Sequence, residues 1–272
     1  MRWKNAPLVS VVTVCRNAEK EVERTIQSVI QQDFPDFEYW IVDGLSTDNT
    51  VDTIEPYRKR LAGFVSEHDT GIYNAMNKAA RLVKGQWIIF MNAGDTFAST
   101  HVLSDVFSKI DESTLSKTDV IYGETIQKRS VGDFKLPNRP LHYILRGMAF
   151  CHQSVFVKTF LLRKFPFNED YRVVADYDFF YQLYLQHANF LFLPVEVSCF
   201  EAETGVSRVK KLQAAKEKAI IQNIDHTLRW KIGFALSVCL FHLKNFFLIL
   251  IPQKTIDWIR HKNYQRKANR CC

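Results

Sequence analysis

Apolar and polar residues along the first hundred positions alternate between two spacings, one typical of strands and the other of helices. The run LVSVVTV at residues 8–14 predicts a strand, and apolar residues at helical spacing from Val22 to Ile30 predict a helix that ends near Gln32. The same alternation predicts strands at residues 37–42, 64–66 and 87–91 and helices at residues 51–61 and 72–83. Strands that alternate with helices predict an α/β fold whose sheet is mostly parallel and flanked by helices.

The predicted strand at residues 87–91 has no polar alternation, which is typical of a strand covered on both faces. Gly85 precedes this strand and is expected to end the predicted helix at residues 72–83 as its C-terminal cap. Beyond Thr100 the order is less regular, with a helical stripe from residue 102 to residue 110 and a strand at residues 120–122. The chain shows no internal repeat and no low-complexity stretch, which argues against a repeat architecture.

Polar residues follow all four of the predicted strands. They are Arg16 and Asn17 after the first, DGLSTDNT (residues 43–50) after the second, EHDTG (67–71) after the third and NAGD (92–95) after the fourth. In an open parallel sheet, ligands bind in the crevice beyond the carboxyl ends of the strands. Four loops are therefore expected to meet at one polar rim. A structural alternative stays open, because the same residue types form turns and helix N-terminal caps.

Three carboxylates suggest chemistry near this rim. Asp95 follows a buried strand, where a carboxylate suits Mg²⁺ or Mn²⁺, which prefer oxygen ligands and accept substrate phosphates. The run ADYDFF places Asp176 and Asp178 at the start of an aromatic helix, and residues two apart point to different faces. One of them is expected to face a pocket, where partial desolvation raises the pKa toward a value useful for a general base. The alternative is a plain helix cap.

The composition fits a globular chain with a distinct tail. Its 272 residues, 47% of them hydrophobic, are enough to bury a sizeable core. The net charge of +7 is uneven, because residues 208–272 hold 14 Lys and Arg against 3 Asp and Glu, which leaves 22 against 26 before them. A basic tail on a slightly acidic body indicates contact with an anionic surface, either lipid head groups or nucleic acid, with a solvated basic helix as the plain alternative.

The apolar part of the tail is about as long as a membrane span. Residues 232–251 read IGFALSVCLFHLKNFFLILI, but His242, Lys244 and Asn245 interrupt the middle, where a charge is costly. A helix lying in the membrane interface therefore fits better than a spanning one, and its basic flanks favour anionic lipids. These flanking residues are Lys231, Lys254, Arg260, Lys262, Arg266 and Lys267. The alternative is a helix that packs on the domain or in a dimer.

Cysteine placement bears on the compartment. The six cysteines form no CxxC pair, and the N-terminal segment MRWKNAPLVS lacks a secretory hydrophobic region before the first strand. A reducing cytoplasmic compartment is therefore expected.

The order of the motifs resembles that of the family 2 glycosyltransferases with a GT-A fold, over about residues 7–207. The motifs are SVVTVCRN, VDGLSTDNT, EHDTGIYNAMNKA, FMNAGDTF, CHQSVFV, ADYDFF and GVS. The resemblance implies a GT-A domain at residues 1–207 and a helical, membrane-associating tail at residues 208–272. It also implies inverting transfer of a sugar, of hexosyltransferase type, from a UDP- or GDP-linked donor to a hydroxyl of a saccharide acceptor, with Mn²⁺ or Mg²⁺ as cofactor.

The same resemblance implies roles for individual residues. Asp95 would be the last acid of the DXD-like motif and would hold the metal, although Asn92 stands where many members have an acid. Asp176 matches the general base, with Asp178 as the fallback. The residues implied to bind the donor nucleotide are Thr13, Arg16, Asn17, Asp43, Ser46, Asp69 and Asn92. His152 and Gln153 are implied to bind the acceptor, and Ser207 and Arg208 the diphosphate.

A lipid-linked acceptor suits a membrane-associated tail. A saccharide on a polyprenyl-diphosphate carrier is expected as acceptor, with the enzyme peripheral on the inner face of the plasma membrane and no nucleic-acid partner. A nucleotidyltransferase or a dinucleotide-dependent oxidoreductase is disfavoured, because TVCRNAEKE after the first strand contains no glycine. Two other readings stay open: a non-catalytic sugar-nucleotide binder and a protein that binds nucleic acid through its basic tail.

Overall fold

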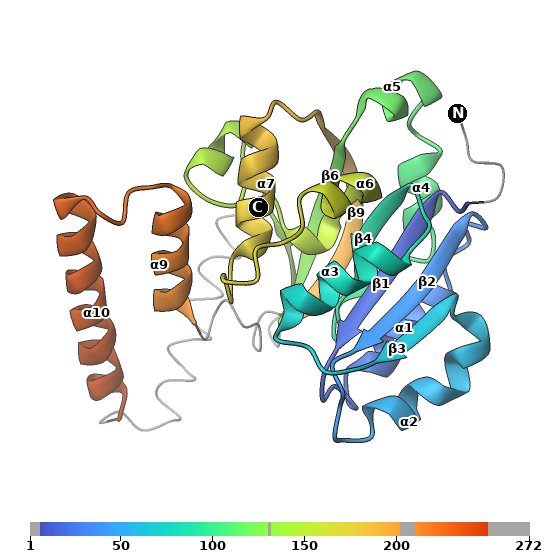
Figure 1. The fold of residues 1–272 in the computed structure, drawn as a ribbon, viewed down its shortest axis with the longest axis horizontal. Coiled ribbons are helices and arrows are strands. Elements are labelled where there is room, and N and C mark those ends of the chain that lie inside the picture. Colours follow the sequence, from blue (N-terminus) through green and yellow to red (C-terminus); the bar gives the residue numbers. More distant parts are fainter. Residues whose placement is uncertain (1–5, 130–131, 202–209, 250–272) are drawn as a thin grey trace.

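The computed structural model describes residues 6–129, 132–201 and 210–249 (Figure 1). In that part of the chain, a nine-stranded sheet runs in the order β3-β2-β1-β4-β8-β6-β9-β5, with β7 paired to β6 outside this path. The strands are β1 (Val9–Cys15), β2 (Phe37–Asp43), β3 (Gly63–Ser66), β4 (Trp87–Phe90), β5 (Thr96–Phe97), β6 (Val120–Arg129), β7 (Gly132–Leu136), β8 (Val155–Lys158) and β9 (Phe190–Glu201).

Helices cover both faces of the sheet (Figure 1). They are α1 (Val22–Ile30), α2 (Thr50–Ile54), α3 (Ile72–Leu82), α4 (Val102–Phe107), α5 (Glu112–Lys117), α6 (Thr159–Lys164), α7 (Ala175–Leu185), α9 (Lys211–Ile221) and α10 (Leu228–Ile249). The described residues also contain three short 3-10 helices: η1 (Glu55–Arg60), η2 (Leu141–Leu145) and η3 (His152–Ser154).

The predicted parallel sheet is found in the first half of the chain. Strands β3, β2, β1 and β4 are all parallel, and their loops at the carboxyl ends share one edge. In the second half, β8 is antiparallel to both β4 and β6, whereas β6 and β9 are parallel. The α/β fold with a mixed, mostly parallel sheet flanked by helices is therefore confirmed.

Alternating side chains of β1 build two separate cores. Val12 and Val14 belong to the cluster that also contains buried residues of α3, α6 and α7. Val9 and Val11 belong to the cluster on the other face, with buried residues of α1 and α4. Successive side chains of a strand point to opposite faces, so a strand that is buried throughout, as β1 is, must be apolar on both.

Two local predictions were wrong. The helix expected at residues 51–61 is α only to Ile54 and continues as η1, in which Pro56 is one of the first residues and lacks a backbone N–H to donate. Gly85 is not a helix cap, because α3 ends at Leu82 and Val83 is already extended. A Cβ on Gly85 would lie 2.5 Å from the backbone nitrogen of Ser10, so this glycine is needed for close packing on β1.

The predicted tail divides into two unlike parts. Helix α9 packs on the main domain, since Ile221 belongs to the same core as the buried residues of α7. Helix α10 lies beside α9 at the end of the molecule away from the sheet (Figure 1), and none of its described side chains is buried. No helix in the described residues is both long enough and apolar enough to cross a membrane. The proposed boundary at residues 207 and 208 lies outside the described residues.

Candidate active site

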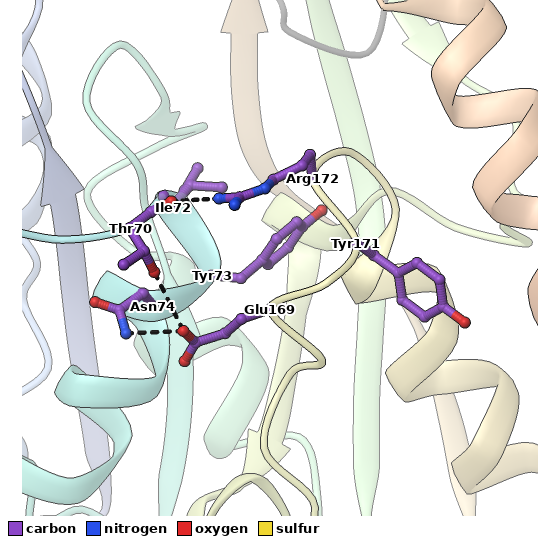
Figure 2. Close-up of a pocket in the computed structure, with 8 residues that line it drawn as sticks. Thr70, Ile72, Tyr73, Asn74, Glu169, Tyr171 and Arg172 are labelled. Carbon is purple, nitrogen blue, oxygen red and sulfur yellow. Dashed lines mark hydrogen bonds between the residues drawn. The ribbon is translucent and has the colours of Figure 1, made fainter.

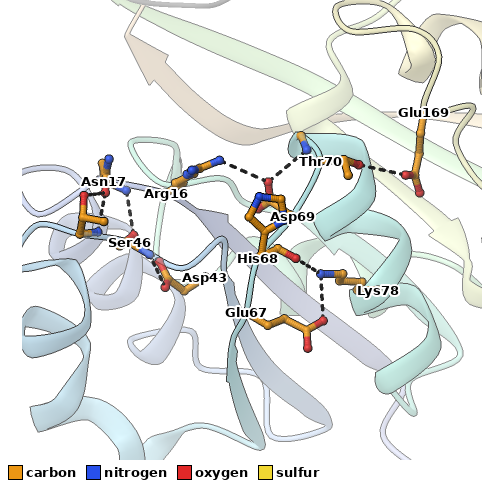
Figure 3. A network of polar contacts seen from close by, with 12 residues as sticks. Arg16, Asn17, Asp43, Ser46, Glu67, His68, Asp69, Thr70, Lys78 and Glu169 are labelled. Atoms are coloured by element: carbon orange, nitrogen blue, oxygen red, sulfur yellow. Dashed lines mark hydrogen bonds and ion pairs between the residues drawn. The ribbon is translucent and has the colours of Figure 1, made fainter.

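The loop after β2 is folded around the carboxylate of Asp43 (Figure 3). Asp43 Oδ2 accepts hydrogen bonds from the backbone N–H of Ser46 (2.9 Å) and from the hydroxyl of Ser66 (2.6 Å). Asp43 Oδ1 accepts from the Ser46 hydroxyl and from Cys15 Sγ, the latter at 3.7 Å. Asp43 is fully buried. It lies at the predicted end of β2 but beneath the rim, where it shapes the loop and presents no exposed atom to a nucleotide.

Asn17 fastens the first loop to the second. Its Oδ1 accepts a hydrogen bond from the backbone N–H of Thr47 (2.8 Å), and its own backbone N–H donates to Ser46 Oγ (2.8 Å). Asn17 and Leu45 both have positive φ, at 50° and 58°, which asparagine tolerates better than leucine. Leu45 is also 52% exposed, so this loop presents a strained, open backbone next to Asn17 and Ser46.

Asp69 brings the third loop against the second. Its Oδ1 accepts the backbone N–H of Gly71 (3.1 Å) and lies 4.0 Å from Arg16 Nη1. A Cβ on Gly44 would lie 2.0 Å from Asp69 Oδ2, so only glycine leaves room for the carboxylate there. Asp69 is 6% exposed, whereas Arg16 is 54% exposed at the surface of the rim. Arg16, Asn17, Ser46 and Asp69 are thus brought together, as expected of one rim.

Thr13 does not belong to this group. It is fully buried, its hydroxyl donates to the backbone oxygen of Met91 (2.8 Å), and it shares a hydrogen bond with the hydroxyl of Tyr39 (2.8 Å). The expectation that Thr13 lines the nucleotide pocket is therefore corrected: its side chain lies on the same face of β1 as Val9 and Val11, within that core, where it ties β2 to the end of β4.

The turn that carries Asp95 is fixed to α1 by one threonine. Thr25 Oγ1 accepts the backbone N–H of Gly94 (2.9 Å) and donates to the backbone oxygen of Asp95 (2.7 Å). Gly94 has φ of 100°, a conformation that glycine adopts without strain. Thr25 is fully buried, and sequence patterns gave no sign of it, because it lies within an apolar helical stripe. It sets where Asp95 points.

Asn92 carries an unpaired oxygen in this turn. Its Oδ1 is buried and has no hydrogen-bond partner in the described structure, which is costly unless a ligand satisfies it. Burial raises the pKa of Asp95 to about 7, although His152, Gln153 and Arg24 each lower it. An amide oxygen and one carboxylate fit Mg²⁺ or Mn²⁺ that takes its other ligands from phosphates and water. Asn92 and Asp95 would hold such an ion; the described residues contain no larger cluster of His, Cys, Asp and Glu suited to a metal.

Asp176 is held from two sides. His152 Nδ1 lies 3.1 Å from Asp176 Oδ2, and the hydroxyl of Tyr73 donates to Asp176 Oδ1 at 3.0 Å. The Tyr73 hydroxyl also contacts the backbone oxygen of Val173 (2.9 Å). Tyr73 was missed as a site residue because it reads as part of an apolar helical stripe, although it lies within the motif EHDTGIYNAMNKA.

The charges of this cluster are coupled. Burial acts to raise the pKa of Asp176, but the hydrogen bond and charge of His152, with help from Tyr73, hold it below its ordinary value. Burial acts to lower the pKa of His152, but Asp176 and then Asp95 raise it above its ordinary value. Asp176 is therefore an ionised acceptor at neutral pH, with a histidine donor fixed beside it.

Asp178 points elsewhere. Its nearest described hydrogen-bond partner is Gln182 Nε2 at 3.4 Å, one turn along α7, and burial raises its pKa. This side-chain contact involves neither His152 nor Tyr73. The geometry thus separates the two acids at the start of α7, with Asp176 facing the rim.

The loop before α7 is attached to α3 beside a small pocket (Figure 2). Glu169 accepts hydrogen bonds from Asn74 Nδ2 (2.9 Å) and Asn77 Nδ2 (2.9 Å). Both bonds lower the pKa of Glu169, and the bond from Asn77 has the larger effect. Arg172 donates to the backbone oxygen of Thr70. The lining residues include Tyr73, so the pocket borders the residue that holds Asp176.

Two groups of predicted site residues remain. Gln153 lies near Asp95 and accepts a hydrogen bond from Cys151 Sγ (2.7 Å), so it and His152 both join the cluster of acids. Ser207 and Arg208 lie outside the described residues. The four cysteines that the structure describes, Cys15, Cys151, Cys199 and Cys239, are free.

Known proteins resemble this chain in sequence. A PGL/p-HBAD biosynthesis glycosyltransferase of Mycobacterium bovis is 32% identical over 182 residues, which cover 64% of this chain and 68% of that protein. The putative teichuronic acid biosynthesis glycosyltransferase TuaG of Bacillus subtilis is 38% identical over 96 residues, which cover 34% of this chain and 37% of TuaG. The similarity thus extends to proteins of glycan biosynthesis in unlike bacteria.

Solved structures resemble it in fold. S. aureus TarS 1-349 in complex with UDP-GlcNAc has a TM-score of 0.63 and 22% identity, over 78% of this chain and 66% of that one. The mannosyltransferase PcManGT from Pyrobaculum calidifontis, in complex with GDP-Man and Mn²⁺, has a TM-score of 0.60 and 18% identity, over 96% of this chain and 85% of that one. The match covers 64% of the TarS 1-349 structure without a named ligand and 39% of the longer TarS structure.

The family match covers the rim itself. Residues 10–172 match the family described as Glycosyl transferase family 2, a segment that contains all four rim loops as well as His152 and Gln153. It ends just before α7, so the role of Asp176 depends on geometry rather than on this match. With a match over more than half of the sequence and a GT-A-like fold, the chain belongs to glycosyl transferase family 2 and is a glycosyltransferase.

Proposed function

We propose that the chain is an inverting, metal-dependent glycosyltransferase that moves a sugar from a UDP- or GDP-linked donor to a hydroxyl of a saccharide acceptor. The observation that carries this proposal is the cluster in which Asp176 is held by His152 and Tyr73 while the charge of Asp95 acts on the same histidine. One carboxylate is thus ionised and oriented, and another lies in a turn with an unpaired amide oxygen. These are the groups that a base and a diphosphate site require.

Asp176 is the proposed general base. An ionised carboxylate accepts the proton of the acceptor hydroxyl as its oxygen attacks the anomeric carbon on the face opposite the diphosphate. The bond between the anomeric carbon and the diphosphate oxygen breaks in the same step, and the electron pair leaves with the nucleoside diphosphate. The hydrogen bonds from His152 and Tyr73 fix the direction of the carboxylate, which favours a single attack geometry.

The donor is proposed to lie across the rim. Arg16, Asn17, Ser46 and Asp69 would contact the nucleotide, and Asp95 and Asn92 would hold Mn²⁺ or Mg²⁺ at the diphosphate. Such an ion, when bound, supplies positive charge to the leaving diphosphate. Ser207 and Arg208 remain proposed diphosphate contacts. The Mn²⁺ named with PcManGT and the UDP-GlcNAc named with TarS support this class of donor and cofactor.

The acceptor is proposed to be a lipid-linked saccharide at the inner face of the plasma membrane. Helix α10 carries a stripe of exposed apolar side chains at helical spacing: Leu228 73%, Ile232 54%, Leu236 59%, Leu240 66% and Leu243 46% exposed. Exposed leucines on a helix with basic neighbours favour an anionic lipid surface. His152 and Gln153 would contact the acceptor sugar. A protein lacking residues 231–272 should lose binding to vesicles that contain anionic lipid; unchanged binding would remove this part of the proposal.

Calorimetric titration with UDP and GDP, each with and without Mn²⁺, tests the donor site first. Metal-dependent binding of one nucleotide supports the proposal and restricts the donor sugars to be tried for turnover. Binding without turnover of any donor would favour a non-catalytic sugar-nucleotide binder. Absence of binding, together with steeply salt-dependent binding of DNA or RNA, would favour a nucleic-acid-binding protein.

A further inference from the structure

The segment that leads into α7, the helix that carries Asp176, is held by a side chain from α9. Glu217 Oε1 accepts the backbone N–H of Arg172 (3.0 Å), and Glu217 Oε2 accepts those of Val173 (3.0 Å) and Val174 (3.2 Å). Val174 is the N-cap residue of α7, and valine has no side-chain oxygen for this purpose. These three amides precede the first turn of α7, so Glu217 fixes the residues that lead into the helix, whereas an N-cap side chain binds the amides of the first turn itself.

The burial of Glu217 makes this attachment more than a surface contact. Glu217 is 7% exposed, and a buried carboxylate is tolerated only where hydrogen bonds replace water. Besides the three backbone donors, Gln213 Nε2 donates to Glu217 Oε1 at 2.8 Å. The negative charge also lies at the N-terminus of α7, where the helix dipole favours it.

We infer that Glu217 is a positioning residue for the transfer reaction, because it fixes the start of α7 and thereby the carboxylate of Asp176. This inference rests on the proposed role of Asp176 as base. Loss of the Glu217 carboxylate leaves three backbone N–H groups without their acceptor. Asp176, in the first turn of the same helix, then competes for them and turns away from His152 and Tyr73.

A second contact between the same helices provides a matched control. Gln222 Nε2 donates to the hydroxyl of Tyr177 (2.7 Å) and to the backbone oxygen of Leu145 (3.2 Å). Gln222→Ala therefore weakens the attachment of α9 to α7 without touching the N-terminal amides. If Glu217 merely helped α9 to pack, Gln222→Ala and Glu217→Ala would have similar effects.

The test compares turnover and amide protection in the full-length chain. With the UDP- or GDP-linked sugar that turns over, Glu217→Ala should lower kcat by at least about tenfold and leave KM for the donor within about twofold. Hydrogen exchange should become faster at residues 172–174. Gln222→Ala should keep kcat within about twofold of the wild type and keep these amides protected.

Glu217→Gln keeps the inference testable if Glu217→Ala does not fold. The three backbone donors use both carboxylate oxygens, so an amide group in place of one oxygen must lose at least one of them. Its kcat should fall by about threefold, between wild type and alanine. Wild-type kcat in Glu217→Gln or Glu217→Ala, together with an inactive Asp176→Asn, would overturn the inference about Glu217 and leave the proposed base in place. An active Asp176→Asn would instead overturn the proposed base.

Discussion

His152 Nδ1 lies 3.1 Å from Asp176 Oδ2, so a residue of η3 directs the carboxylate at the start of α7. Both side chains are partly buried, at 31% and 17% exposed, and the pair is therefore screened less by solvent than an exposed ion pair. The pair joins the segment that follows the matched rim loops to the helix that supplies the proposed base. Substitutions at either residue should therefore change kcat and leave donor binding nearly unchanged.

Asp176→Asn should lower kcat by about a hundredfold or more and leave donor affinity within a few fold, because the amide cannot accept the proton. Asp178→Asn is the matched control at the same end of α7, and it should turn over like wild type since its described partner is Gln182. Turnover of the donor sugar and calorimetric donor binding measure the two effects. The reverse pattern, with Asp178→Asn inactive, would reassign the base.

His152→Ala should move the acidic limb of the pH–kcat profile to higher pH. The hydrogen bond and charge of His152 hold the pKa of Asp176 below its ordinary value, so the ionised base is lost only as the pH falls through that lowered value. Without His152, burial dominates and raises the pKa, and the ionised fraction disappears at a higher pH. His152→Gln is a useful companion, because it keeps a hydrogen-bond donor but no charge, and should lie between. A limb that does not move would contradict the electrostatic role.

Asp95 should make metal-dependent nucleotide binding sensitive to pH near neutrality. Burial raises its pKa to about 7, so the carboxylate that would hold the cation is increasingly protonated as the pH falls through that value. Affinity for Mn²⁺ with the bound nucleotide should then weaken by roughly fivefold between pH 7 and pH 6. Asp95→Asn should bind the pair weakly and lose this dependence. An unchanged pH dependence in Asp95→Asn would assign it to the nucleotide or to another residue.

The fold and the rim were predictable from local patterns because each strand, helix and turn is encoded by residues that are neighbours in the sequence. Alternating strands and helices gave the sheet, and turn-forming residues at strand ends located Asn17, Ser46, Asp69 and Asp95. The burial of Thr13 and Asp43 was not predictable, since a threonine or aspartate near a strand end looks alike whether it points into the core or out of it.

Contacts between segments that are distant in the sequence could not be predicted from local patterns. Thr25 contacts Asp95 70 positions away, Tyr73 contacts Asp176 103 positions away, and Glu217 contacts Val173 44 positions away. Each of the three lies in a helix whose periodicity indicates only which residues are buried. The Gly85 prediction failed for a related reason, because the constraint comes from Ser10 of a neighbouring strand and not from the end of α3.

Thr25→Val should loosen the turn that carries Asp95 with little change of shape. The substitution removes the hydroxyl that accepts from Gly94 and donates to the backbone of Asp95, and buried unpaired groups cost about 1–3 kcal/mol. The free energy of unfolding should fall by that amount, and metal-dependent nucleotide affinity should fall as well. Thr53→Val, whose hydroxyl contacts only the backbone of its own helix at an exposed position, is the control. A destabilised variant with normal affinity would limit Thr25 to a structural role.

Gly44→Ala should disturb the rim through Asp69 alone, which a double-mutant cycle can establish. The new Cβ would lie 2.0 Å from Asp69 Oδ2 and 3.3 Å from Arg16 Cδ, and the flexible arginine can move away. Overpacking of this kind costs about 1–3 kcal/mol of folding free energy, and the displaced carboxylate should also weaken nucleotide binding.

Asp69→Ala removes the atom with which the new Cβ collides, so Gly44→Ala should cost much less stability in that background than in wild type. The coupling measured from chemical denaturation of the four proteins should be about 1 kcal/mol or more in favour of the double variant. Additive costs would mean that the clash at residue 44 is relieved in another way, by movement of the loop after β2. In that case Asn17 and Ser46 would move with the loop, and nucleotide affinity would fall even when Asp69 is absent.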